Sequence, residues 1–266
     1  MFDLHALGRD SASRRQFLAV MTAAGLGLAA HQLFAADGTT PTPPPVGGGT
    51  ANGVPTDFTA QFGSFPGAGD QKVLNFALTL EILEADLYRQ ALNIASGKSI
   101  TAPLGAASSY SRKVGGGGLN ADDTSEGYQY LKDFTFVEAA HRDFLRTVLG
   151  SVAVKPNANG YKFPKAPAAN IASLLTAILP LEETGVRAYL GALPYLTNLA
   201  TAQVAGGIFS TEARHSAVVA YTLGVDIGPR KLPGDRMVTA TYPSQNTFEY
   251  FLTPREVLSA AAVYFK

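Results

Sequence analysis

The sequence predicts an all-α fold, an antiparallel four-helix bundle followed by a short C-terminal helix. Apolar residues recur at intervals of three and four in segments near residues 70–96, 125–149, 170–190 and 197–223. None of these segments shows the sustained alternation that marks a half-buried β-strand. In addition, each of the four apolar stripes carries a glutamate, so the helices are expected to meet around acidic side chains.

The composition fits a globular domain and excludes several classes of function. A chain of 266 residues with 46% hydrophobic residues can bury a sizeable core. Its formal net charge is zero and its basic residues are scattered, so no nucleic-acid partner is expected. It has no cysteine, so disulfides and thiolate ligands are unavailable. Any metal site must therefore use oxygen and imidazole ligands.

The N-terminal segment, residues 1–36, has the features of a twin-arginine export signal. Arg14 and Arg15 precede a moderately apolar, Ala/Gly-rich run that ends in small residues, with cleavage expected after Ala35 or Ala36. We expect recognition by the twin-arginine export machinery and a periplasmic or extracellular location. An uncleaved membrane anchor and a chance arginine pair are the alternatives. The glycine content and the missing basic stop-transfer cluster argue against an anchor.

The remaining chain divides into three parts. Residues 37–69 include "TTPTPPPVGGGTANGVP", a composition that cannot bury enough surface to offset ordering entropy, so they predict a disordered linker. Residues 70–226 are expected to form the bundle, and residues 227–266 a C-terminal extension. The run Gly115 to Gly118 lacks the strand and helix context of a phosphate loop, so it predicts a flexible loop.

The first helix is expected to start at Asp70 as its N-cap and to end near Ser96, with Glu81 on its inner stripe. The second is expected over residues 125–149. Its inner face should carry these residues: Leu131, Phe134, Glu138, His141, Leu145 and Val148.

The third helix is expected from an Asn170 N-cap to about Leu190, with Glu182 on its inner stripe. Pro180 lies inside this pattern. Because proline removes one backbone hydrogen bond, it predicts a kink just before Glu182.

The fourth helix is expected over residues 197–223, with Glu212 and His215 aligned on one face. The extension ends in "TPREVLSAAAVYF", in which Thr253 and Glu256 have the spacing of a capping box. This predicts a short terminal helix that covers an end or a side of the bundle.

Both histidines outside the N-terminal segment lie in Glu-x-x-His motifs, "EAAH" ending at His141 and "EARH" ending at His215. Residues three apart share a helix face, so each motif can present a carboxylate and an imidazole to one point. A single core histidine is more often a hydrogen-bonded packing residue. Two matching motifs on two predicted helices favour metal ligands instead.

The inward carboxylates need a positive counter-charge, because a lone buried carboxylate would rather take up a proton. Four carboxylates are balanced by two divalent ions, with neutral imidazoles completing the coordination. The predicted metal ligands are Glu81, Glu138, His141, Glu182, Glu212 and His215. Glu84 and Glu183 remain open as alternative ligands or as neighbours of the ligands.

Two tyrosines lie two helical turns after the stripe glutamates of their own helices, Tyr88 after Glu81 and Tyr189 after Glu182. We assign Tyr88 a catalytic role in electron transfer to the metals. A purely structural core tyrosine is the alternative at both positions.

The segments "VLNFALTLEILEADLYRQAL", "EAAHRDFL", "LEETGVRAYLGA" and "EARHSAVV" together resemble the bacterial ferritin-like domain proteins, in the group that includes desiccation-related proteins. The ending "PREVLSAAAVYF" is also similar to that group. The resemblance covers about residues 70–265 and implies a ferritin-like four-helix fold. It further implies a carboxylate-bridged centre of two iron ions, or of manganese or a mixed iron and manganese pair.

Three functions compete at this point. An exported oxidoreductase or ferroxidase would use the metals to reduce dioxygen or peroxide. A structural or desiccation-protective bundle would use them only to hold the helices together. A metal-free interaction module would need six buried carboxylates and imidazoles by accident. A homo-oligomer stays open, although the linker and the Gly/Ser-rich insertion between the first two helices would crowd an iron-storage shell.

Overall fold

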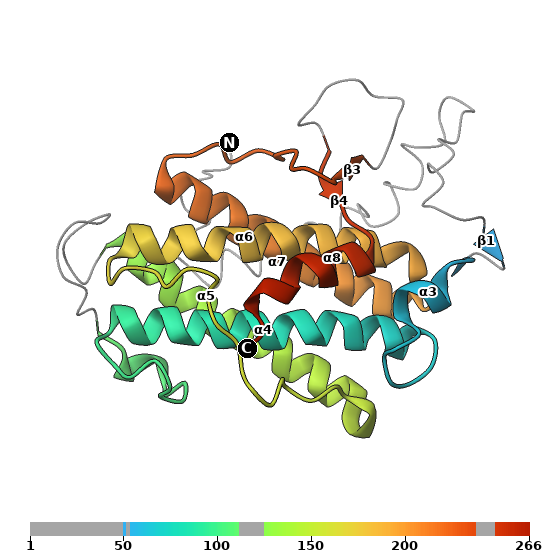
Figure 1. Ribbon diagram of the computed structural model, residues 1–266, viewed down its shortest axis with the longest axis horizontal. Coiled ribbons are helices and arrows are strands. Elements are labelled where there is room, and N and C mark those ends of the chain that lie inside the picture. The colour runs from blue at the N-terminus through green and yellow to red at the C-terminus, as the bar shows by residue number, and fades with distance from the viewer. Residues whose placement is uncertain (1–49, 52–53, 112–124, 238–247) are drawn as a thin grey trace, which may run out of the picture. The chain divides into compact units, whose positions relative to one another are not determined.

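The computed structural model describes residues 50–51, 54–111, 125–237 and 248–266 (Figure 1). The expected export signal, residues 37–49 and 52–53 of the expected linker, and the run Gly115 to Gly118 lie outside these residues. Within the described ranges, no helix is both long and apolar enough to cross a membrane.

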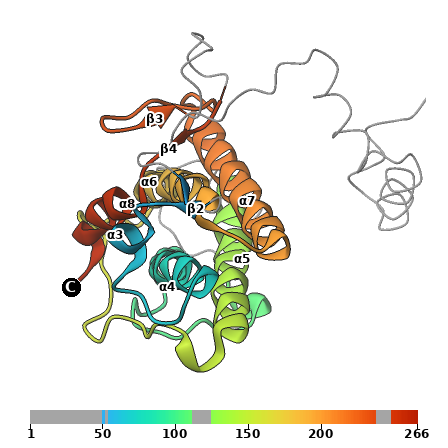
Figure 2. The same ribbon diagram turned by 90° about the vertical axis from the view of Figure 1, so that its right-hand side faces the viewer.

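Four long helices dominate the described part of the chain and confirm the all-α prediction. They are α4 (Asp70–Ala95), α5 (Glu126–Leu149), α6 (Ile171–Ala192) and α7 (Leu199–Leu223). Helix α4 packs chiefly against α5, and α6 chiefly against α7. The end-on view shows the four helices grouped as a bundle (Figure 2).

The starts of α5, which follows Ser125, and of α6 agree with the sequence, while those of α4 and α7 differ from it. The Asn170 side chain caps α6 by accepting a hydrogen bond from Ser173 N, as predicted. Helix α7 begins two residues later than expected, with Asn198 as its cap. The prediction that Asp70 caps α4 is wrong, because Gly69 holds that position. The Asp70 carboxylate instead accepts hydrogen bonds from the backbone N–H groups of Thr197 and Asn198, which ties the start of α4 to the start of α7.

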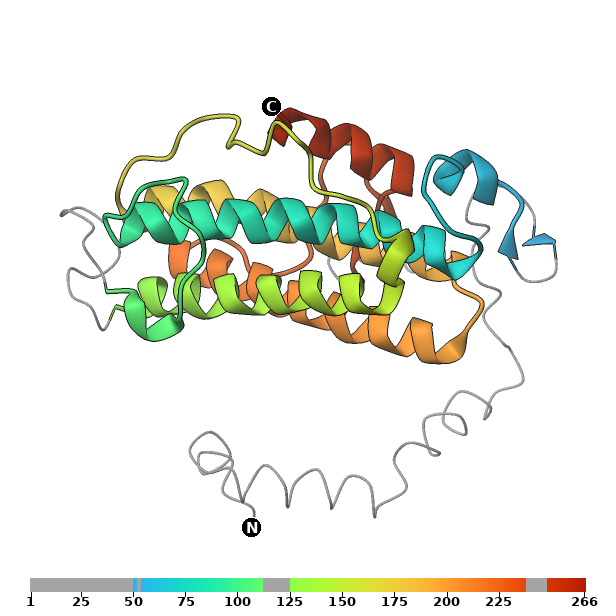
Figure 3. The same ribbon diagram turned by 90° about the horizontal axis from the view of Figure 1, so that it is seen from below.

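The helix directions follow from contacts at the two ends of the bundle. At one end, Asn75 near the start of α4 donates to the carbonyl of Val152, just beyond the end of α5. At the other end, Ser96 just beyond α4 lies 3.1 Å from the hydroxyl of Tyr128 near the start of α5. Helices α4 and α5 are therefore antiparallel, and α6 and α7 form a second antiparallel pair (Figure 3).

One long crossover joins the two pairs, so α5 and α6 run parallel rather than antiparallel. It leaves the end of α5 through the 3₁₀ turn η3 (Gly150–Val152) and returns along α4. Val154 N donates to Asn75 Oδ1 near the start of α4, and Gln90 near its end donates to the carbonyl of Tyr161. A single long crossover is the connection found in ferritin-like bundles.

The prediction of a disordered linker is wrong for the described end of that segment, which is packed against the bundle. Strand β1 (Thr50–Ala51) pairs with β2 (Val54–Pro55), and helix α3 (Phe58–Phe62) follows. The Phe62 ring is fully buried and packs edge-on against Tyr195, with the ring centroids 5.0 Å apart. Aromatic side chains thus supply the apolar surface that the Gly/Pro-rich part lacks.

The C-terminal extension covers one side of the bundle. Strand β3 (Arg236–Met237) pairs with β4 (Tyr250–Phe251), and α8 (Pro254–Ala261) packs against α6 and α3. The predicted capping box is confirmed: Glu256 N donates to Thr253 Oγ1, and Thr253 N donates to the Glu256 carboxylate. Gly191 allows this close approach, because a Cβ there would lie 1.9 Å from the carbonyl oxygen of Leu252.

Two further predictions concerned Pro180 in α6 and the inward face of α5. Helix α6 is assigned as continuous through Pro180, and the Thr184 hydroxyl donates to the Pro180 carbonyl. On α5, Val148 is 54% exposed while Leu149 is buried, so the prediction that Val148 faces inward is wrong. After Leu145, the next buried residue on this face is Leu149, four residues on, and not Val148, three residues on. Both spacings fit one face of a helix.

Candidate metal centre

All six predicted ligands meet in the interior of the bundle. Glu81 comes from α4, Glu138 and His141 from α5, Glu182 from α6, and Glu212 and His215 from α7. The four glutamates are fully buried and His215 is 4% exposed. Only the His141 side chain, 14% exposed, is in partial reach of solvent.

The six residues form two overlapping groups that could each hold a metal ion. One group is Glu81, Glu138, His141 and Glu212, and the other is Glu138, Glu182, Glu212 and His215. In each group the ligand atoms all lie within 4.8 Å of one another. Each group therefore has three carboxylates and one imidazole, and Glu138 and Glu212 belong to both.

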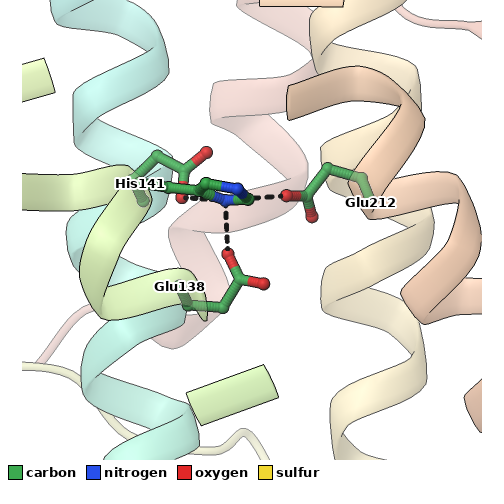
Figure 4. Close-up of side chains that lie close together, drawn as sticks. Glu138, His141 and Glu212 are labelled. Atoms are coloured by element: carbon green, nitrogen blue, oxygen red, sulfur yellow. Dashed lines mark hydrogen bonds and ion pairs between the residues drawn. The ribbon is translucent and has the colours of Figure 1, made fainter. Parts of the chain in front are cut away.

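The His141 ring lies among three carboxylates (Figure 4). Its Nδ1 is 3.1 Å from Glu138 Oε2, 3.4 Å from Glu212 Oε1 and 3.5 Å from Glu81 Oε2. One nitrogen cannot direct a hydrogen at three oxygens at once. The convergence of four ligand atoms on one point is the arrangement that a shared cation would need.

His215 has the corresponding place in the second group. Its Nδ1 lies 2.8 Å from Glu138 Oε1 and 3.5 Å from Glu182 Oε2. At 2.8 Å the His215 and Glu138 atoms are close enough for an ion pair. They are not aligned as a hydrogen bond, so both atoms lack a hydrogen-bond partner. The imidazole stacks on the Phe134 ring, with the ring centroids 3.8 Å apart, which fixes its orientation.

The two tyrosines reach across the bundle to each other's helix. Tyr88 of α4 donates a hydrogen bond to Glu182 of α6. Tyr189 of α6 donates to Glu81 Oε1 of α4, at 2.6 Å. Glu81 belongs only to the first metal group and Glu182 only to the second. Each group therefore has one carboxylate that is oriented by a tyrosine hydroxyl from the other helix. Burial, together with the neighbouring carboxylates, raises the pKa of both tyrosines well above 10, so the hydroxyls remain donors.

Unpartnered buried atoms test whether the site fits a metal. Buried side-chain atoms without a hydrogen-bond partner include Glu81 Oε2, Glu138 Oε1, Glu182 Oε2, both oxygens of Glu212 and Nδ1 of His215. Leaving a buried polar atom unpaired costs folding free energy. A cluster of such atoms in one place therefore needs a common partner. All are atoms of kinds that can bind a metal, and divalent cations coordinated by oxygen and imidazole would satisfy them together.

The titration of the protein without metal reflects the same crowding of charge. Burial opposes the imidazolium form of His141, but the carboxylates of Glu138, Glu212 and Glu81 outweigh it and raise its pKa to about 12. In the same way the pKa of His215 rises to about 9. Burial raises the pKa of Glu81 to about 7. For Glu212, burial and the repulsion of its neighbours raise the pKa well above the usual range.

The structure separates the two glutamates that the sequence left open. Glu183 lies outside both metal groups and instead binds Arg187 and Arg230, with Oε2 2.7 Å from Arg187 Nη1. Arg187 also pairs with Asp235, so this network ties the C-terminal extension to α6. Glu84 also lies outside both groups, but it is buried beside them and its Oε2 has no partner.

The sequence reading did not single out Gly185, which shapes the centre. It lies one turn after Glu182, and a Cβ there would come within 2.8 Å of Glu212 Oε2 and 3.3 Å of Glu84 Oε1. The missing side chain therefore leaves room for two carboxylates. The available signal was a glycine inside a helical pattern, three residues after a predicted ligand.

Comparison with known proteins agrees with this geometry. No curated protein matches the chain. A protein-family model described as the ferritin-like domain matches residues 69–225, from the residue before α4 to just beyond α7. That match spans more than half of the chain and contains all six residues of the centre. The chain belongs to the ferritin-like domain family.

Proposed function

We propose that the six side chains hold two metal ions in a carboxylate-bridged centre that reduces peroxide or dioxygen. The ions would be iron, or manganese, or one of each. The observation that carries this proposal is the pair of overlapping groups that share Glu138 and Glu212. Two ions held in this way match the charge of the four carboxylates, and each keeps one imidazole.

Two bound divalent ions would together supply two electrons, which with two protons convert one hydrogen peroxide to two waters. The protein's part is to hold and orient the ligands. Glu138 and Glu212, which belong to both groups, would serve both ions, while Tyr88 and Tyr189 donate hydrogen bonds to the carboxylates of Glu182 and Glu81. The apolar bundle around them excludes bulk water.

The alternative is a structural or stress-protective bundle, for desiccation or envelope integrity, whose metals only hold the helices together. One observation favours it: the four glutamates are fully buried. Closed coordination marks structural metal sites, while catalytic sites keep an open position. The exposed edge of His141 and the cavity described below favour the catalytic proposal.

We also propose that the protein is exported by the twin-arginine route. The support is the order of Arg14, Arg15 and the Ala/Gly-rich run. This route carries folded proteins, so the centre could be loaded with metal before export. The resemblance to desiccation-related proteins fits an envelope location.

The deciding experiment measures metal content and oxidation in the same sample. Purified protein should bind about two metal ions per chain after anaerobic reconstitution with ferrous iron or Mn²⁺. The iron form, mixed with peroxide or air in a stopped-flow instrument, should be oxidised in a fast phase that saturates at about two electrons per chain. Metal loading without any oxidation phase, but with a large loss of thermal stability on chelation, would establish the structural alternative.

A further inference from the structure

A small cavity lies beside the candidate metal centre, between α4, α6 and the C-terminal segment. It is lined by Leu83 and Glu84 of α4, Thr184 and Gly185 of α6, and Ala261 and Tyr264, among others. Of its lining residues only Thr184 is not buried, so the cavity faces solvent on that side. Its walls are almost entirely apolar, and it has room for about one water-sized molecule.

Glu84 provides the carboxyl group at the inner end of this cavity. Its side chain is 3% exposed, and its Oε2 is buried without a hydrogen-bond partner. Gly185, which also lines the cavity, lies against both Glu84 Oε1 and Glu212 Oε2. The cavity therefore ends next to a carboxylate that belongs to both metal groups.

The chemistry of the cavity selects the kind of molecule that fits it. A hydrated cation would lose most of its water shell against apolar walls, which is costly. A neutral molecule of nearly the size of water enters without that cost. The unpartnered Glu84 Oε2 further favours a ligand with an O–H donor. Hydrogen peroxide has two such donors, whereas dioxygen has none.

We propose that this cavity binds hydrogen peroxide, with Glu84 accepting a hydrogen bond from it and placing it beside Glu212. The proposal rests on the peroxide-reducing function proposed above. Glu84 binds the oxidant directly here and is not itself a metal ligand. The cavity is thus the route from solvent to the metal centre for this oxidant.

The binding step can be tested without turnover. Zinc has no redox chemistry, so zinc-loaded protein can be titrated with hydrogen peroxide while the methyl NMR signals of Leu83, Leu181 and Ala261 are followed. We expect saturable shifts of these signals and no comparable shifts elsewhere. Glu84→Leu should weaken the binding about tenfold, as for the loss of one buried hydrogen bond, and Glu84→Gln, which keeps an acceptor oxygen, should weaken it less.

The access step can be tested with two cavity-filling variants. Ala261→Leu fills the proposed cavity, and Ala192→Leu fills a second apolar cavity nearer the end of α6, bordered by Val73 and Ala205. We expect Ala261→Leu to slow oxidation of the iron form by peroxide about tenfold, with unchanged metal content. Ala192→Leu should leave that rate unchanged. Should Ala261→Leu not fold, Leu83→Phe fills the same cavity from α4.

Several outcomes would overturn the proposal. Absent or non-saturable shifts in the zinc-loaded protein would show that peroxide does not bind there. Equal slowing by both filling variants would show that the cavity is not the route. A fall in metal stoichiometry in Glu84→Leu would identify Glu84 as a metal ligand. Loss of the oxidation phase in wild type, with the zinc-form shifts intact, would instead refute the proposed function and leave the binding site standing.

Discussion

The hydroxyl of Tyr88 in α4 donates a hydrogen bond to the carboxylate of Glu182 in α6. The reverse bond, from Tyr189 to Glu81, completes the pair. Helices α4 and α6 therefore each provide one carboxylate to the centre and one tyrosine. The tyrosine of each helix orients the carboxylate of the other helix. The two helix pairs are related in this way around the candidate metal centre.

At saturating metal, Tyr88→Phe should still load with metal but alter turnover. The ring stays in its packing site, but Glu182 loses its hydrogen bond and the centre loses the tyrosine predicted to transfer electrons. We expect first-turnover oxidation to change less than about threefold, and later turnovers to slow by about tenfold or more, the usual cost of losing an oriented ligand contact. Stopped-flow measurements over successive peroxide additions would show this.

Tyr189→Phe is the matched control, because it removes the equivalent bond to Glu81. If the two variants behave alike, the effect comes from carboxylate positioning, and the special role of Tyr88 in electron transfer is refuted.

His141→Ala and His215→Ala should each weaken metal binding by more than about 100-fold, since losing a residue that only positions a ligand already costs about 10- to 100-fold. Glu183→Gln is the control. Its carboxylate pairs with Arg187 and Arg230 and is absent from both metal groups. Elemental analysis and isothermal titration would compare the three variants. Equal losses in all of them would mean that the ligands are misassigned.

Gly185→Ala should separate stability from metal binding. Alanine favours the helix by about 1 kcal/mol relative to glycine. However, its Cβ would lie 2.8 Å from Glu212 Oε2 and push this carboxylate away. We expect a metal-free protein that is at least as stable as wild type but has reduced metal affinity.

Gly206→Ala in α7 provides the comparison for this variant, because a Cβ there meets no atom within 4 Å. It should gain stability and keep full metal affinity. Unchanged metal affinity in Gly185→Ala would contradict the crowding inferred at Glu212. Thermal melts and metal titrations of both variants give the two readouts.

The metal-free protein should lose stability as the pH rises from about 5 to about 8. The pKa of Glu81 rises from 4.5 to about 7, and that of His215 from 6.5 to about 9. The folded state therefore binds more protons than the unfolded state in this window, and their release costs folding free energy. Metal ions replace these protons, so metal binding should strengthen with pH.

Melting temperatures of metal-free and metal-loaded protein across this range would test that expectation. The gap between the two forms should widen as the pH rises. Glu138, whose pKa is lowered because its two histidines outweigh burial, acts mainly below pH 4.5 and does not change the sign. A metal-free melting temperature that increases from pH 5 to pH 8 would refute this account.

Replacing Arg14 and Arg15 by Lys should leave an uncleaved precursor in the cytoplasm, because the arginine pair is the part of the signal that the export receptor reads. Cell fractionation and immunoblotting measure this. Export of the Lys variant at the wild-type level would indicate another route, and full-length wild-type protein in the membrane fraction would support the anchor alternative.

The features that could be predicted from the sequence depend on residues within one or two helical turns of each other. The Asn170 cap and the Thr253 capping box are bonds between residues three apart, and both form as predicted. The two Glu-x-x-His motifs each place both side chains on one helix face for the same reason. Helix existence and inward faces follow from the same short-range periodicity.

The contacts between side chains across the bundle could not be predicted from the sequence. Asp70 looked like a cap but binds the start of α7, and Tyr88 orients Glu182 rather than Glu81 of its own helix. The direction of α6 depends on the crossover along α4, which no local pattern encodes. Glu183 follows Glu182 directly, but one helical step of about 100° turns it toward Arg187 and away from the centre. These contacts join residues far apart in sequence, so they are fixed by how whole helices pack, not by local residue preferences.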